Sequence, residues 1–353
     1  MMKYKKPSRN FITYAGVIIA FLLCELALAG TIDGFKMSRS LKGQLVPICV
    51  YIVMAVSLNL TVGISGELSL GHAGFMSVGA FSGILVSQYL LFAFPDANLE
   101  VIRLIGALIA GGLFAGIAGV LIGIPVLRLR GDYLAIVTLA FGEIIRNLFN
   151  CIYFSVEGIG LNFSFLNPNV PGKMLINGPM GATGIKKLAT FEVGFLLVMF
   201  TLNVVLNLIN SRSGRAIMAI RDNRIAAESV GINVTKYRML AFVVSAALAG
   251  MAGALYGLNF SQIQAVKFKF DTSILVLVFV VLGGIGNIRG SVIAAAALTV
   301  LPEMLRQFGD YRMLIYAIVL ILVMLASNNP VIKHTLEDIA GKLKKTKKEG
   351  NQA

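Results

Sequence analysis

Long apolar segments, separated by short polar stretches, are the feature of this sequence that most constrains its fold. Most of them reach the roughly 20 residues that a helix needs to cross a bilayer. Lipid offers the backbone no hydrogen bonds, so a spanning segment must be a helix or part of a closed barrel. The segments are continuously apolar, whereas barrel strands alternate at every second residue. The sequence therefore predicts an all-α integral membrane protein with about ten transmembrane helices.

Composition agrees, because only 14% of the residues are charged, against roughly 25% in soluble domains. The eighth apolar segment is too short for a simple crossing. The predicted spans cover residues 11–30, 44–62, 72–91, 103–124, 133–154, 191–209, 240–263, 272–282, 291–307 and 314–327.

The formal net charge of +14 comes from basic residues that gather at the termini and between spans. That distribution is typical of topology signals and not of a nucleic-acid surface. It favours a multi-pass protein of a prokaryotic cytoplasmic membrane with both termini inside. The expected parts are a membrane domain, residues 1–332, and a charged cytoplasmic tail, residues 333–353. The domain includes a cytoplasmic loop, residues 212–238, and an external loop, residues 155–190, with little regular structure.

No metal or cofactor site is expected. Cys24, Cys49 and Cys151 lie within apolar segments, without the spacing of metal ligands or of a disulfide framework. The phosphate-binding pattern G-x-x-x-x-G-K-[ST] is absent from the sequence, so the chain does not bind ATP through such a loop.

The loop of residues 212–238 is unusually polar and helix-prone for a connection between spans. Asp222 and Asn223 suit the first position of a helix, where a side chain accepts backbone hydrogen bonds. Gly231 suits the left-handed position that ends one. We expect a helix of about two turns, whose exposed Ala226, Ala227 and Val230 fit a groove on another protein. The alternative is a solvated loop whose charge only sets topology.

Two glycine-rich stretches, residues 62–74 and 283–291, interrupt apolar segments without a long loop. Broken helices in corresponding places of two halves indicate an internal repeat and the substrate path of a transporter. Ordinary tight turns are an equally good interpretation, and Arg289 fits a cytoplasmic turn.

Several polar residues within the spans are candidates for a translocation path. Glu143, Arg146, Asn147 and Asn150 share one helix face, and ionisable residues at membrane depth face a bundle interior or a water-filled path. A structural Glu143–Arg146 pair is the alternative. The candidate path residues are Asn59, Ser65, Glu67, Ser69, His72, Glu143 and Asn147.

An enzyme is disfavoured. Residues Gly63 to Gly66 match the G-x-S-G pattern of intramembrane serine proteases, whose serine needs a histidine from a later helix. His72 follows Ser65 too closely, and no later span contains a histidine.

Eight further stretches carry a more specific resemblance: 57–63 (SLNLTVG), 66–74 (GELSLGHAG), 127–135 (LRLRGDYLA), 214–216 (GRA), 219–221 (AIR), 227–234 (AESVGINV), 241–255 (AFVVSAALAGMAGAL) and 281–286 (VLGGIG). On these residues the chain resembles the permeases of branched-chain amino acid ABC importers, of the LivM type. The resemblance runs through nearly the whole membrane region.

The resemblance implies a heterodimer with a sister permease, two cytoplasmic ATPase subunits and an extracytoplasmic solute-binding protein, in contact with membrane lipid. The substrate would be a branched-chain amino acid, urea or a short amide. The cytoplasmic helix of residues 223–231 would be the coupling helix that sits on an ATPase. The implied coupling residues are Arg215, Arg221, Asp222, Asn223, Ala226, Ala227, Glu228 and Gly231. An ion-coupled secondary transporter, with Glu25 or Glu143 as the coupling carboxylate, is the alternative.

Overall fold

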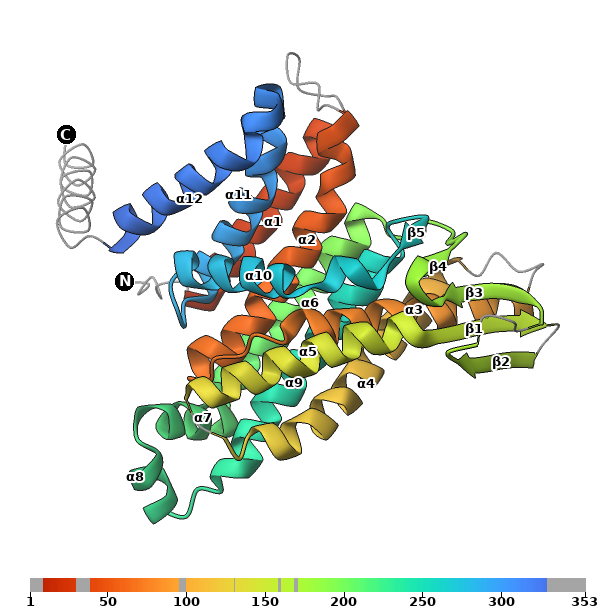
Figure 1. The fold of residues 1–353 in the computed structure, drawn as a ribbon. Helices are drawn as coiled ribbons and strands as arrows, with labels where there is room; N and C mark the ends of the chain where they lie inside the picture. The colour runs from red at the N-terminus through yellow and green to blue at the C-terminus, as the bar shows by residue number, and fades with distance from the viewer. Residues whose placement is uncertain are drawn as a thin grey trace, which may run out of the picture. The chain divides into compact units, whose positions relative to one another are not determined.

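The computed structural model describes residues 9–29, 39–94, 100–129, 131–157, 160–167 and 171–328 (Figure 1). The chain divides into two compact units between Thr299 and Val300. The expected tail of residues 333–353 lies outside the described residues.

The first unit is built around four helices: α2 (Arg39–Asn59), α3 (His72–Ala93), α4 (Glu100–Val126) and α9 (Val234–Gly257). Glycines allow α3, α4 and α9 to touch backbone to backbone, because no side chain separates them. A methyl group on Gly79 of α3 would overlap the carbonyl of Gly250 of α9, and one on Gly111 of α4 would lie 2.9 Å from that carbonyl oxygen.

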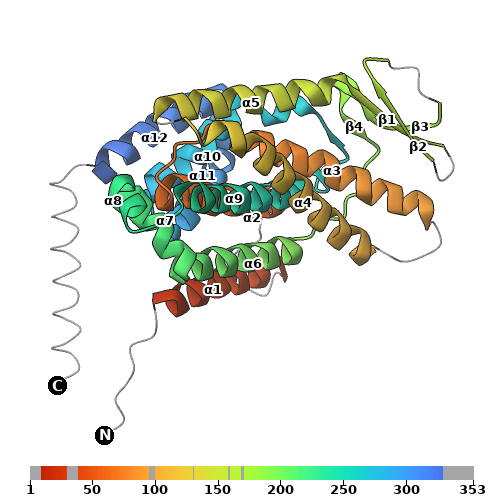
Figure 2. The ribbon, with the colours of Figure 1, turned by 90° about the horizontal axis from the view of Figure 1, so that it is seen from below.

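Five more helices of this unit surround the central four: α1 (Arg9–Ala29), α5 (Asp132–Cys151), α6 (Phe191–Asn210), α10 (Phe270–Gly283) and α11 (Ile288–Met304), whose last residues belong to the second unit. Phe21 of α1 stacks on Phe191 and Phe195 of α6. Figure 2 shows α1 and α6 on one side of α2 and α9, and α5 on the opposite side.

Seven helices of the described residues are long and apolar enough to cross a membrane. Shorter apolar helical stretches are residues 13–26 of α1, the whole of α10 and residues 312–325 of α12 (Arg312–Asn328). Their outer faces carry large apolar side chains, a pattern that favours lipid over water. On α4 the exposed apolar residues are Val101, Ile102, Ile105, Ile109, Leu113, Phe114, Ile117, Val120, Leu121 and Ile124. The all-α membrane fold is confirmed, and α10 is as short as expected.

The expectation that residues 155–190 have little regular structure is wrong, because this segment contributes to a small antiparallel sheet. Four strands come from it: β1 (Ile152–Glu157), β2 (Gly160–Phe165), β3 (Lys173–Asn177) and β4 (Ala182–Thr183), with the 3₁₀ turn η2 (Gly178–Met180) between the last two. The fifth, β5 (Gln262–Ile263), follows α9, and the strand order is β2-β1-β3-β4-β5. The fifth predicted span therefore ends early, at Cys151, because the next residues pair with β2 and β3.

The loop of residues 212–238 forms two helices, α7 (Arg212–Asp222) and α8 (Arg224–Ser229). Figures 1 and 2 show these helices at one end of the α3–α4–α9 bundle and the sheet at the other end. A further 3₁₀ turn, η3 (Ala265–Phe268), leads from β5 to α10.

The second unit contains the last turn of α11, the 3₁₀ segment η4 (Leu305–Tyr311) and α12. Gly309, with φ of +55°, produces the kink within η4. Arg306 and Glu303 form an exposed ion pair at 3.3 Å.

Candidate functional site

The predicted short helix of the cytoplasmic loop is confirmed as α8. The backbone N–H of Ala226 donates to Oδ1 of Asn223 at 3.1 Å, so Asn223 is the N-cap. Gly231 has φ of +82°, the left-handed conformation that ends a helix cheaply at glycine. Asp222 does not cap α8; it ends α7, which the sequence did not predict and whose own N-cap is Ser211.

The exposed apolar face of α8 differs from the one predicted. Ala227 is buried and packs with Ile220 of α7 and Val234 of α9, because it lies on the helix side that faces the bundle. The exposed apolar side chains are Ile225, at 81%, and Val230, at 74%. Ala226 is also exposed. This part of the chain therefore presents apolar side chains to the solvent next to an ion pair between Arg224 and Glu228, at 3.0 Å.

The two glycine-rich breaks contact each other. The first follows the π-helical turn η1 (Leu60–Ile64) at the end of α2, and the second is the turn between α10 and α11. A methyl group on Gly63 would lie 2.7 Å from the Cα atom of Gly286. Asn59 joins the breaks: its Oδ1 accepts from the N–H of Gly286 at 2.9 Å, and its Nδ2 donates to Oγ of Ser291 at 2.9 Å.

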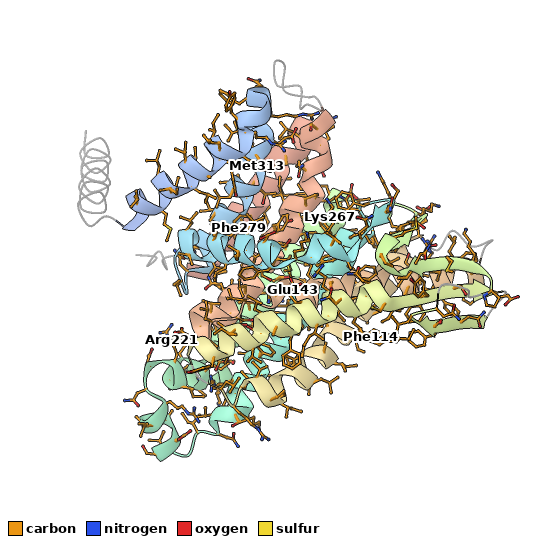
Figure 3. The ribbon with its side chains drawn as sticks, in the orientation of Figure 1. Phe114, Glu143, Arg221, Lys267, Phe279 and Met313 are labelled. Atoms are coloured by element: carbon orange, nitrogen blue, oxygen red, sulfur yellow. The ribbon has the colours of Figure 1, made fainter. Side chains whose placement is uncertain are left out.

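This junction lies at the end of the bundle that carries α7. Nη1 of Arg221, near the end of α7, donates to the carbonyl oxygen of Gly63 at 2.9 Å. Its Cγ atom occupies the space beside Gly66, where a methyl group would lie 2.6 Å away. Figure 3 shows Arg221 at this end and Glu143 midway along α5. Both breaks are therefore turns near the cytoplasmic loop, and the internal repeat stays a prediction.

Residues 65–71 form a segment without regular secondary structure between η1 and α3. Its side chains alternate, with Ser65, Glu67 and Ser69 buried and Leu68 exposed at 38%. Glu67 forms an ion pair with Arg238 of α9, with side-chain exposures of 4% and 11%. The Oγ atoms of Ser65 and Ser69 and the Oε2 atom of Glu67 are buried without a hydrogen-bond partner.

The C-terminal end of this segment and the first turn of α3 are hydrogen-bonded to α5 and α10. The N–H of Leu70 donates to Oγ1 of Thr138 on α5 at 3.0 Å. The N–H of Ala73, in the first turn of α3, donates to Oγ of Ser273 on α10 at 3.0 Å. These contacts were not predictable from local patterns, because each joins residues far apart in the chain.

His72 is buried and hydrogen-bonded to Ser57, with 2.8 Å between Nε2 and Oγ. Ser65 Oγ has no partner, so the two residues of the protease interpretation do not form a pair. Among the described residues no group of three His, Cys, Asp or Glu side chains could hold a metal ion.

Five of the seven predicted path residues are buried. Asn59, Ser65, Glu67, Ser69 and His72 are each at most 5% exposed, so they do not line an open surface in this structure. Three of them, Asn59, Glu67 and His72, are bonded through their side chains to other buried segments.

The remaining two lie on α5. Glu143 forms the anticipated ion pair with Arg146, at 2.7 Å, and its Oε1 accepts from the N–H of Phe270 at the start of α10, at 3.2 Å. Asn147 is exposed beside the apolar side chains of Ile144 and Leu148.

A cavity of about 630 Å³ lies elsewhere, between α1, α2, α6 and α11. Its lining is almost wholly apolar, with Thr13 and Arg289 hydrogen-bonded to each other at 2.6 Å. None of the predicted path residues lines it.

The apolar helices and the pair α7 and α8 define a class of protein. It is a multi-pass membrane protein with a structured helical segment at one end of its bundle. Residues 41–324 match the family described as branched-chain amino acid transport system / permease component. The chain belongs to this family and is a permease subunit of an ABC importer, not an enzyme.

Curated relatives cover most of the chain. It is 34% identical to the high-affinity branched-chain amino acid transport system permease protein LivM of Salmonella typhimurium and 35% identical to LivM of Escherichia coli; each match covers 94% of this chain and 79% of the relative. It is 27% identical to a probable LivM of Methanocaldococcus jannaschii, over 68% of this chain and 74% of the relative. No solved structure was found to match the chain.

Proposed function

We propose that this chain carries branched-chain amino acids across the cytoplasmic membrane, together with a sister permease, two ATPase subunits and an extracytoplasmic binding protein. The support for the substrate is the identity of about a third to two LivM permeases over 94% of the chain. Urea and short amides are the competing substrates.

We propose further that α8 docks on an ATPase subunit. Ile225 and Val230 are the observation that carries this proposal, because two large apolar side chains stand in solvent on a capped helix. Burying such side chains in a partner's groove removes apolar surface from water. Arg215 is exposed on α7 and can contribute charge to the same contact.

The proposed translocation path runs along α5, facing the sister permease. A solute that passes between two chains touches only side chains that each chain exposes. Of the predicted path residues, Asn147 is exposed and the Glu143 side chain is 30% exposed, whereas the other five are buried. Tyr133, Ile136 and Ile144 give the same helix an exposed apolar face.

The orientation that fits this proposal has α7, α8 and both termini in the cytoplasm and the small sheet outside. It places the basic residues of the loop, Arg212, Arg215, Arg221, Arg224, Lys236 and Arg238, on the inner side.

Reconstitution with the partner subunits tests the function. We expect ATP-dependent uptake of labelled leucine into proteoliposomes, with competition by isoleucine and valine and none by urea. Uptake that is driven by an ion gradient without any ATPase subunit would instead support a secondary transporter. Competition by urea alone would refute the substrate assignment.

Substitution of Ile225 with Asp tests the docking helix, because a charge in an apolar contact resists desolvation. We expect the ATPase subunit to be lost from the purified complex while the permease remains folded. Val266→Asp, at a 41% exposed position beyond α9, is the matched control and should keep the ATPase. Equal retention in both variants would refute the docking assignment.

A further inference from the structure

The connection between the cytoplasmic helices and the transport path can be followed residue by residue. We propose that Arg221 and Arg238 are positioning residues that transmit movement of α7–α9 to the irregular segment of residues 65–71, and through it to α5 and α10. This inference rests on the proposed function, in which an ATPase moves α8.

The first connection is made by Arg221. Asp222 holds its guanidinium, with Nε at 3.1 Å and Nη2 at 2.9 Å from Oδ1, and leaves Nη1 directed at the carbonyl oxygen of Gly63. The aliphatic part of the side chain packs against Gly66. A shift of α7 therefore moves the start of the segment, through the hydrogen bond to Gly63 and the packing against Gly66.

The second connection is the ion pair between Arg238 and Glu67, in the middle of the segment. Nη1 of Arg238 also donates to the carbonyl oxygen of Leu127, just after α4, at 3.3 Å. Both side chains are nearly excluded from solvent, so separating them exposes charge to a poor environment. Movement at the beginning of α9, directly after α8, therefore draws Glu67 with it.

The segment passes this displacement on at its far end. Leu70 is hydrogen-bonded to Thr138 of α5, and Ala73 to Ser273 of α10. These two helices also meet at the Glu143–Phe270 hydrogen bond. Since the proposed path follows α5, the contacts form a continuous chain from the docking helix to the path.

The test uses the full reconstituted importer and measures uptake per ATP hydrolysed. Arg221→Ala and Arg238→Ala should lower this ratio about tenfold, a typical size for coupling between two sites. ATPase association and basal hydrolysis should persist in Arg238→Ala, because that change leaves α7 and α8 untouched. Arg221→Lys and Arg238→Lys, which keep a donor and a charge, should restore most of the ratio.

Two further variants separate a loss of coupling from misfolding of the permease. Ser273→Ala removes one hydroxyl at the far end of the connection and should also lower the ratio. Arg212→Ala is the matched control: an exposed arginine at the first position of α7, nine residues before Arg221. It should behave like the wild type.

The outcomes are distinct. An unchanged ratio in both alanine variants and in Ser273→Ala would overturn the proposal. So would uptake and hydrolysis that fall together, since that indicates only structural roles. A wild-type complex that neither binds an ATPase nor imports the amino acids would overturn the proposed function itself, whereas a normal wild type and Arg212→Ala control confine the failure to the two arginines.

Discussion

Replacing Gly63 with alanine should push apart the two helix breaks. The added methyl group would lie 2.7 Å from the Cα atom of Gly286 and still closer to its nitrogen and to Oδ1 of Asn59. Two of these three neighbours are backbone atoms, so no rotamer change relieves the overlap. The breaks must separate, and both hydrogen bonds of Asn59 across the junction are then strained or lost.

The magnitude follows from these two effects. Overpacking a tight contact costs about 1–3 kcal/mol. Two hydrogen bonds contribute about 0.5–1.5 kcal/mol each. We therefore expect Gly63→Ala to lower the free energy of unfolding by about 2–6 kcal/mol on these two principles together.

Denaturant titration of the purified chain in detergent measures the change. Gly43→Ala is the matched control, because Gly43 is on α2, the helix directly before η1, and a methyl group there meets nothing within 4 Å. Alanine in an unobstructed helix should stabilise by about 0.5–1 kcal/mol. Equal midpoints and slopes for the two variants would show that the breaks do not touch, and the junction described above would be refuted.

Three further predictions use the same unfolding assay. Gly79→Ala should destabilise the chain by about 1–3 kcal/mol through overpacking, whereas Gly116→Ala, with its nearest neighbour at 3.6 Å, should be tolerated; similar losses would contradict the described packing. Asn59→Ala should cost about 1–3 kcal/mol, because it leaves buried groups unpaired, and no loss would mean that water replaces the amide. Glu67→Gln should cost about 3–5 kcal/mol by leaving a buried guanidinium unpaired; Glu100→Gln, which breaks an exposed ion pair with 58% of the Glu100 side chain accessible, should show no measurable change.

The sequence predicts the positions of helices and helix ends, because these depend on residues that are close together in the chain. Apolar runs located the helices because a spanning helix satisfies its own backbone. The ends of α8 were predictable from Asn223 and Gly231, since capping depends on one or two side chains.

Contacts between distant residues were not predictable in the same way. The strands β1 and β3 gain their partners only when the segment folds back, so the outer loop read as irregular. Ala227 read as exposed because the helix face that α7 covers is set by tertiary packing.

The candidate site shows the same limit. Polar residues within apolar segments were correctly singled out, but most of them proved to be buried connections rather than a surface. Glu67 gave no sign of its partner Arg238, because the two lie on different elements far apart in the chain. One general rule did apply to Glu67. A carboxylate that is buried in a membrane protein pairs with a basic side chain, and few basic residues lie close to the spans.

In the proposed importer an ATPase subunit drives the permease through its contact with α8. Site-specific cross-linking tests it most directly. In a chain whose Cys24, Cys49 and Cys151 are replaced by alanine, a single cysteine at Ile225 should cross-link to the ATPase subunit of the assembled complex. A single cysteine at Thr183, in the sheet at the opposite end of the bundle, should give no such product. A product from Thr183 and none from Ile225 would contradict the account.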